Sequence, residues 1–142
     1  MRRLGPALLL AALSAAPARA LDLPPLCKAL RGLGEEARSS GQPIRISAAV
    51  DLGAPGDCRP AADSAAARAF CAAAAQAEGL AWRIYDCENT LSSDAQVTTR
   101  AEHAEHRFRK AITRLTFNVG RGARFDLTEA SGRYDIVVWA PK

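Results

Sequence analysis

The last third of the chain carries the pattern that most restricts the fold. Apolar and polar residues alternate there in three runs, and the first run places Leu115, Phe117 and Val119 on one side. Two short turn-forming segments, 120–122 and 130–132, separate the runs. Period-two alternation is typical of strands with one buried face, and connections this short join antiparallel neighbours. The sequence therefore predicts an antiparallel meander of three strands at its C-terminal end.

Four elements are predicted before the meander, in the order helix, strand, helix, strand. Leu26, Leu30 and Leu33 recur at helical spacing, and Pro24 and Pro25 stand at a helix start, where proline is tolerated. The four elements are a helix over 26–38, a strand over 44–52, a helix from Asp63 or Ser64 to about 78, and a strand over 80–85.

Residues 97–112 fit two patterns. Ala101, Ala104 and Phe108 fall at helical spacing, whereas Val97 and the nearby threonines favour a strand. We favour a helix over 100–112 and leave the strand open as the alternative.

These elements together predict an α+β fold. A strand–helix–strand crossover over 44–87 is right-handed in nearly all proteins, and it would make its two strands parallel. With the meander added, the prediction is a two-layer sandwich: a mixed sheet of about five strands, with two or three helices on one face. The predicted domain covers residues 21–142, an ordinary size for one domain.

Residues 1–20 have the three-part layout of a secretory signal peptide. Arg2 and Arg3 form a basic start, a short apolar stretch follows, and residues 18–20 have the small-x-small pattern of a cleavage site. The apolar stretch is shorter than the roughly 20 residues that cross a membrane, so we expect no membrane span. The general secretory route is favoured over the twin-arginine route, which the Arg-Arg pair leaves open. We therefore expect a periplasmic or secreted bacterial protein.

All four cysteines lie after the predicted leader. An even number of cysteines in an exported chain predicts two disulfides. If the two N-terminal strands are parallel, their C-terminal ends share one sheet edge, which brings Cys58 and Cys87 together. Cys27 and Cys71 then lie on helices of the same sheet face. We therefore predict the pairs Cys58–Cys87 and Cys27–Cys71, although spacing alone does not fix the connectivity.

The charge balance argues against a general nucleic-acid binder. Without the three arginines of the leader, 16 Lys and Arg residues face 15 Asp and Glu residues. A domain so near neutrality lacks the electric field that attracts phosphates. The charge is unevenly distributed, because residues 21–99 carry a net −3 and residues 100–142 a net +4. The C-terminal part could therefore meet an acidic protein or an envelope component.

The chain offers one weak candidate for catalysis. Its only histidines, His103 and His106, are three residues apart, so on a helix they would share a face with Glu102. With Asp86 as a further carboxylate, these residues would form the acid–base set of a small secreted hydrolase. The basic residues that follow the histidines would repel a metal ion, so the sequence predicts no metal site and no cofactor.

The polar side of the predicted sheet is the stronger candidate site. Four of the predicted strands place an arginine there, and arginine and aromatic residues are enriched at binding surfaces. We therefore favour a non-enzymatic exported binding protein, of inhibitor, immunity or envelope accessory type, over the small hydrolase. The partner and the oligomeric state stay open. The predicted binding residues are Arg45, Arg83, Tyr85, Arg114 and Arg124.

Overall fold

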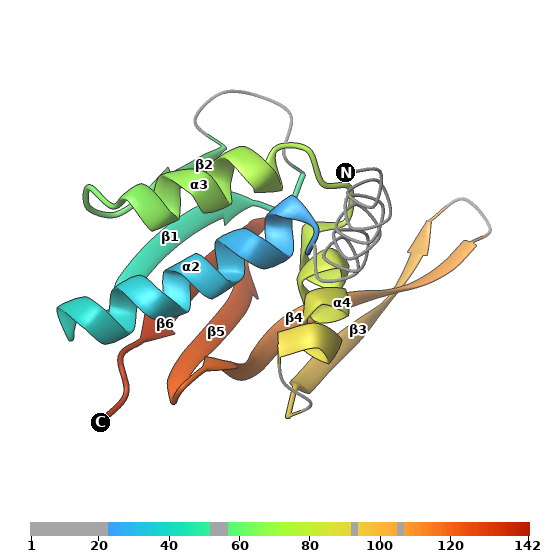
Figure 1. The fold of residues 1–142 in the computed structure, drawn as a ribbon. Coiled ribbons are helices and arrows are strands. Elements are labelled where there is room, and N and C mark those ends of the chain that lie inside the picture. The colour runs from blue at the N-terminus through green and yellow to red at the C-terminus, as the bar shows by residue number, and fades with distance from the viewer. Residues whose placement is uncertain (1–22, 52–56, 92–93, 105–106) are drawn as a thin grey trace, which may run out of the picture.

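The computed structural model describes residues 23–51, 57–91, 94–104 and 107–142. The three helices of these residues lie on one face of a single sheet (Figure 1). The predicted leader, residues 1–20, lies outside the described residues. The structure confirms the α+β class, the placement of the helices on one face and the presence of two disulfides.

Six strands form the sheet, and every neighbouring pair is antiparallel. In chain order they are β1 (Ile44–Ala49), β2 (Cys58–Pro60), β3 (Gln96–Ala104), β4 (Arg107–Gly120), β5 (Ala123–Ala130) and β6 (Arg133–Trp139). Their order in the sheet is β2-β1-β6-β5-β4-β3, so β2 and β3 are its edges. β4, β5 and β6 are the predicted meander, which the structure confirms.

Helix α2 (Pro25–Ser40) packs on the central strands β4, β5 and β6. Leu30, Leu33 and Ala37 recur at spacings of three and four, and all three are fully buried. Gly41 ends the helix with a φ of 70°, and its N–H donates to the carbonyl of Ala37. The predicted helix over 26–38 is therefore confirmed, with slightly wider bounds.

Helix α3 (Ala65–Ala74) packs beside α2 over the β1–β2 edge of the sheet (Figure 1). Ser64 is its N-cap: the hydroxyl accepts a hydrogen bond from the Ala67 N–H at 3.0 Å. Glu36 of α2 accepts hydrogen bonds from the Ser64 hydroxyl and the Ala66 N–H. A carboxylate at this position is stabilised by the positive, N-terminal end of the helix dipole. Here it also connects α3 to α2.

Residues 80–85 form part of a helix, not the predicted strand. Helix α4 (Leu80–Leu91) buries Leu80, Ile84 and Cys87 on one side, at the spacing of a helix face. Trp82, which a strand would have placed beside them, is 40% exposed. The spacing of Leu80 and Ile84 fits the helical period as well as the strand period. An alternation this short therefore does not distinguish a helix from a strand. The predicted parallel pair is therefore wrong, and the sheet is antiparallel rather than mixed.

Residues 97–104 and 107–112 lie in strands, so the favoured helix over 100–112 is also wrong. β3 pairs with β4 from Gln96 to Ala104, whereas β5 pairs with β4 only from Arg114 to Gly120. The remainder, residues 99–104 and 107–113, has no third strand and extends from the body as a two-stranded ribbon, which we call the β3–β4 arm (Figure 1). Trp82 supports its base by donating a hydrogen bond to the Lys110 carbonyl at 3.0 Å.

The disulfides join Cys27 to Cys87 and Cys58 to Cys71, with Cα atoms 5.3 and 5.5 Å apart. Both predicted pairings are therefore wrong. Cys87 lies on the buried side of α4, which packs against α2, so its neighbour is Cys27. The prediction placed Cys58 beside Cys87, at the C-terminal ends of two parallel strands. Instead the chain reverses between β2 and α3, and α3 packs back on β2, which brings Cys71 to Cys58.

All four cysteines are bonded, and such bonds persist in oxidising compartments outside the cytoplasm. The chain is therefore expected to act in an extracytoplasmic environment. In the part of the chain that the structure describes, no helix combines the length and the apolar character needed to cross a membrane.

Candidate binding face of the sheet

The candidate site is the outer face of the sheet, which is the face opposite the three described helices (Figure 1). Alternation along the strands creates it: in β6, Ile136 and Val138 are fully buried toward the helices, whereas Trp139 is 42% exposed. β1 and β5 show the same alternation. The outward-facing residues of β1, β4, β5 and β6 include Arg45, Arg114, Thr116, Arg124, Asp126, Val137 and Trp139.

Trp139 lies between two arginines on neighbouring strands. The guanidinium of Arg45, on β1, lies over the indole ring at 5.4 Å from its centroid. Arg124, on β5, is the direct cross-strand neighbour of Trp139. A cation over the face of a tryptophan is attracted by the ring quadrupole, by about 0.5–1 kcal/mol at exposed sites. The contact therefore holds Arg45 and Trp139 in place as one exposed cationic and aromatic surface.

Val137 supplies an apolar centre beside this surface. It points away from the helices because it lies between the inward-facing Ile136 and Val138, yet it is only 7% exposed. Its cross-strand neighbours are Arg45 on one side and Asp126 on the other. The long side chains around it thus cover an apolar residue on a face that is otherwise polar.

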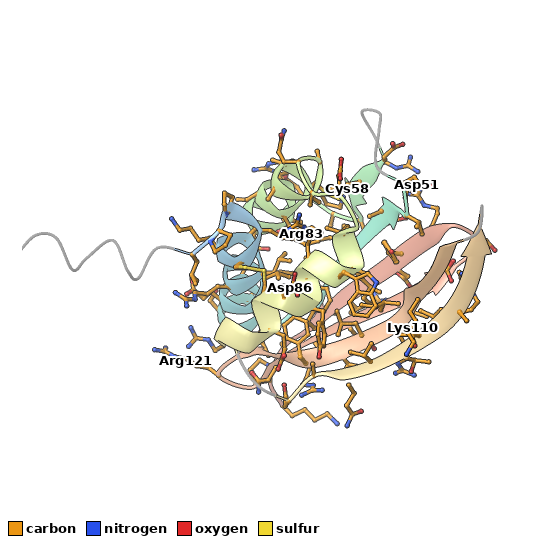
Figure 2. The ribbon with its side chains drawn as sticks, turned by 90° about the vertical axis from the view of Figure 1, so that its right-hand side faces the viewer. Asp51, Cys58, Arg83, Asp86, Lys110 and Arg121 are labelled. Atoms are coloured by element: carbon orange, nitrogen blue, oxygen red, sulfur yellow. A yellow bond between two sulfur atoms is a disulfide. The ribbon has the colours of Figure 1, made fainter. Side chains whose placement is uncertain are left out.

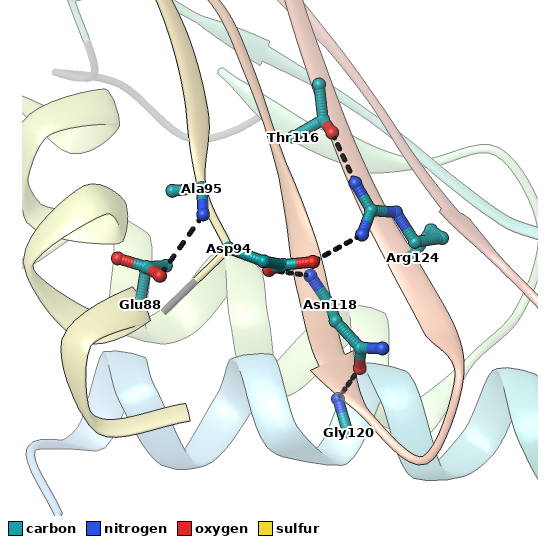
Figure 3. A network of polar contacts seen from close by, with 7 residues as sticks. All are labelled: Glu88, Asp94, Ala95, Thr116, Asn118, Gly120 and Arg124. Atoms are coloured by element: carbon teal, nitrogen blue, oxygen red, sulfur yellow. Dashed lines mark hydrogen bonds and ion pairs between the residues drawn. The ribbon is translucent and has the colours of Figure 1, made fainter. Parts of the chain in front are cut away.

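Arg124 belongs to a polar network that fixes the start of β3 (Figure 3). Its guanidinium donates to Asp94 Oδ2 and to Thr116 Oγ1, both at 2.7 Å. The other oxygen of Asp94 accepts the Asn118 N–H at 2.9 Å. Next to it, buried Glu88 of α4 accepts the Ala95 N–H at 3.2 Å. Arg124 therefore helps to hold the start of β3 in place, whereas Arg45 takes no part in this network.

Arg114 lies close to Asp126 without a hydrogen bond. The Arg114 Nε and Asp126 Oδ1 atoms are 3.9 Å apart, and this oxygen is buried without a hydrogen-bond donor among the described residues. The pair nevertheless opposes charges on adjacent strands, which favours the observed register. Arg114 itself is 60% exposed at its side chain, so its charge is presented to the solvent.

We expect a small coupling between Asp94 and Arg124. Both side chains are nearly half exposed, so solvent weakens the ion pair, and a double-mutant cycle with D94A and R124A should give about 0.5–1 kcal/mol. Urea unfolding of the four proteins measures it. A coupling near zero would contradict the view that this pair fixes β3. The control is the exposed pair between Arg68 of α3 and Asp63, which precedes that helix, with an expected coupling at the lower end of that range.

The chain matches no family model, no curated protein and no solved structure. The chemistry of the outer face is therefore the basis for interpreting it.

Three of the five predicted binding residues lie on the outer face, and two do not. Arg45, Arg114 and Arg124 lie on β1, β4 and β5 as predicted. Arg83 and Tyr85 lie on α4, on the helix side of the molecule (Figure 2 labels Arg83). Tyr85 packs edge-to-face against Trp82, with ring centroids 5.8 Å apart. Neither residue lies on the outer face of the sheet, because their segment forms a helix and not the predicted strand.

The candidate catalytic set depended on a helix over 100–112, which the structure does not contain. His103 and Glu102 are consecutive residues of strand β3, so the helical spacing on which the predicted set depended does not apply to them. His106 lies outside the described residues. Asp86 is exposed on α4 (Figure 2). No cluster of three or more metal-ligating side chains occurs within residues 23–51, 57–91, 94–104 and 107–142, as far as their side chains are described.

The sequence-based prediction missed the apolar part of the face. It included Arg45 but not its contact with Trp139, because that contact depends on strand register, which the sequence does not reveal. Val137 did leave a signal. It stands between two inward-facing residues of a predicted strand, so three consecutive apolar residues indicate an apolar position on the outward face.

Proposed function

We propose that this protein is a non-enzymatic binding protein of the cell envelope or the secreted fraction, of inhibitor, immunity or accessory type, and that it binds an acidic partner protein on the outer face of its sheet. The observation that carries the proposal is the group formed by Arg45, Trp139 and Val137. Buried aromatic and arginine anchors dominate the energy of protein interfaces, and these residue types lie together here on the face that none of the described helices covers.

The charges of this face favour an acidic partner. Arg45 has no carboxylate partner among the described residues, and Arg114 is largely exposed. Across the outward positions of the strands, arginines outnumber aspartates: Arg45, Arg59, Arg114, Arg124 and Arg133 against Asp126 and Asp135. A positive surface speeds association with a negative one and disfavours basic partners.

The compartment supports the same proposal. The two disulfides, together with a predicted leader over residues 1–20, favour the periplasm of a Gram-negative bacterium or the medium beyond it. Small domains that act there as inhibitors or accessory proteins work by binding and need a stable presenting surface. A disulfide-bonded domain with one sheet face open supplies such a surface.

A double variant tests the proposal directly. The immobilised mature protein is used to isolate its partner from the extracytoplasmic fraction of the source bacterium, and the Kd of the purified pair is then measured. Replacing Arg45 with Glu and Trp139 with Ala should weaken binding at least about 30-fold, because anchors of this kind contribute about 2 kcal/mol or more. Neither side chain supports the core, so the variant should unfold within about 1–2 kcal/mol of the wild type.

The matched control reverses a charge on the opposite side of the molecule. Arg31 is exposed on α2, so Arg31→Glu makes the same charge change away from the outer face. It should leave the Kd within about threefold, that is, within about 0.7 kcal/mol. Equal binding by the double variant and the wild type, or an equal loss with Arg31→Glu, would rule out the outer face as the binding surface.

A further inference from the structure

The two edges of the sheet differ in how well they are protected. β2 has three residues, includes Pro60, and is bonded to the overlying α3 through Cys58. A short strand, proline and a covering helix are devices that keep an edge from pairing with another chain. β3, at the other edge, has nine residues, and within the described part of the chain it hydrogen-bonds to a strand only on its β4 side.

The first part of β3 is well suited to strand pairing. Residues 96–101 are all exposed, and they include neither proline nor glycine. Val97, Thr98 and Thr99 are β-branched, which fits an extended strand, and Arg100 is the one charged residue of this stretch. Val97 is also one of the few large hydrophobic residues that are exposed in the described part of the chain. The edge is thus open, and its one charged side chain is paired with Glu129 at 3.2 Å. The β3–β4 pairing shifts register between Thr98 and Thr99, but the extra residue, Thr113, belongs to β4, so β3 itself keeps its alternation.

We propose that two copies of this chain pair through β3, antiparallel and edge to edge, so that their sheets become continuous. A two-fold axis perpendicular to the sheet keeps the outer faces of both copies on the same side. Because opposite residues in paired strands point to the same face, this axis must pass midway between the two copies of one residue. An axis at Arg100 would set two guanidinium groups opposite each other, each paired with Glu129 of its own copy at 3.2 Å, and like charges directly opposite each other are unfavourable. An axis at Thr99 instead sets Val97 of each copy opposite Ala101 of the other.

The hydrophobic residues of the helix side support the axis at Thr99. Ala101 is the cross-strand neighbour of Lys110, and Trp82 donates its indole N–H to the Lys110 carbonyl. Trp82 therefore lies in the same cross-strand row as Ala101. Pairing about Thr99 adds Val97 of the other copy to that row, and so it brings together two exposed hydrophobic residues, Trp82 at 40% and Val97 at 36% exposure.

The pairing would also complete the β3–β4 arm. An isolated two-stranded ribbon is marginally stable in water, and three or more strands are needed for independent stability. In the dimer each arm gains a strand from the other copy. Because strands add in the plane of the sheet, the outer face of each copy stays open, so this inference does not depend on the proposed function. A contact of this size is small, and we expect a Kd on the order of 10–100 μM.

Charge variants at the axis test the dimer and its register together. In Thr99→Lys, two lysines would face each other across the axis at about 5 Å between Cβ atoms, and in Thr99→Glu two glutamates would do so. We expect sedimentation equilibrium to show a concentration-dependent dimer for the wild type. Each variant alone should be monomeric, with the Kd raised at least tenfold, and an equimolar mixture of the two should associate again as a heterodimer.

Thr128→Lys is the matched control. Thr128 is exposed on β5, an interior strand, so this variant adds the same charge away from the edge and should dimerise like the wild type. Recovery in the mixture separates lost pairing from misfolding, because a misfolded variant would not associate. A wild type that stays monomeric to millimolar concentration, equal dissociation in Thr128→Lys, or no association in the mixture would each overturn the proposal.

Discussion

Replacing Cys27 and Cys87 together with alanine should lower the free energy of unfolding by about 4 kcal/mol. The two residues are 60 positions apart, and closing a loop of that length removes much conformational freedom from the unfolded chain. Both residues are buried, at 5% and 3% exposure, in the contact between α2 and α4. The loss is a large part of the stability of a domain this size, so the variant should unfold at a clearly lower guanidinium concentration.

The Cys58–Cys71 disulfide is the internal control for this prediction. Its residues are 13 positions apart, for which the same loop-closure relation gives about 3 kcal/mol. Both of its cysteines are half-buried rather than buried, so a mild reductant should open it first. Mass mapping after partial reduction and guanidinium unfolding of both double-alanine variants measure the two effects. A larger loss at Cys58–Cys71, or earlier reduction of Cys27–Cys87, would contradict the assignment of the buried bond as the more important one.

The elements that the sequence predicts correctly are those whose local signals agree with their burial. α3 starts directly after its N-cap Ser64, because a serine there satisfies a free N–H of the first turn without any tertiary contact, although the helix ends at Ala74 and not at about 78 as predicted. The meander of β4, β5 and β6 follows from alternation on one face joined by tight turns. In α2 the leucine spacing, the prolines before it and Gly41 after it all indicate the same helix.

The two errors arise where short patterns fit two periods. Leu80 and Ile84 are four apart, which suits a helix face as well as every second position of a strand. Burial of Ala81 and Cys87 decides for the helix, and burial is a tertiary property. In the β3–β4 arm, small alanines made a helix plausible, but pairing with β4 provides the hydrogen bonds that a strand needs. Both disulfide predictions failed with the first of these errors, because they assumed a strand at 80–85.

The candidate site shows the same division between local and long-range information. Alternation alone places Arg45, Arg114 and Arg124 on one face of a sheet. The sequence does not reveal which of them is engaged within the protein, because that depends on register. Arg124 is bound to Asp94, which lies 30 positions earlier, whereas Arg45 is stacked on Trp139. Arg45 is therefore the better residue for testing binding, since changing Arg124 would also loosen β3.

Replacing Gly34 with alanine should destabilise the protein by about 1–3 kcal/mol, although alanine is the better helix former. Gly34 lies on the buried side of α2, next to Val119 of β4. A Cβ atom at this position would lie 2.7 Å from Val119 Cγ2 and 3.1 Å from the Val119 carbonyl oxygen. Neither neighbour can yield cheaply, because one is a stiff β-branched side chain and the other is backbone of the sheet. The helix must therefore move away from the sheet that it covers.

Gly32, one half-turn away on the same helix, provides the opposite expectation. A Cβ atom there meets nothing within 4 Å, so Gly32→Ala should stabilise the protein by about 0.5–1 kcal/mol. The double variant Gly34→Ala/Val119→Ala adds a second check. Removing Cγ2 should make the cost of Gly34→Ala smaller in the Val119→Ala background than in the wild type, a coupling that urea unfolding can measure. If Gly34→Ala stabilises the protein as Gly32→Ala does, the close packing of α2 on β4 is wrong, and with it the spacing between the helix layer and the sheet.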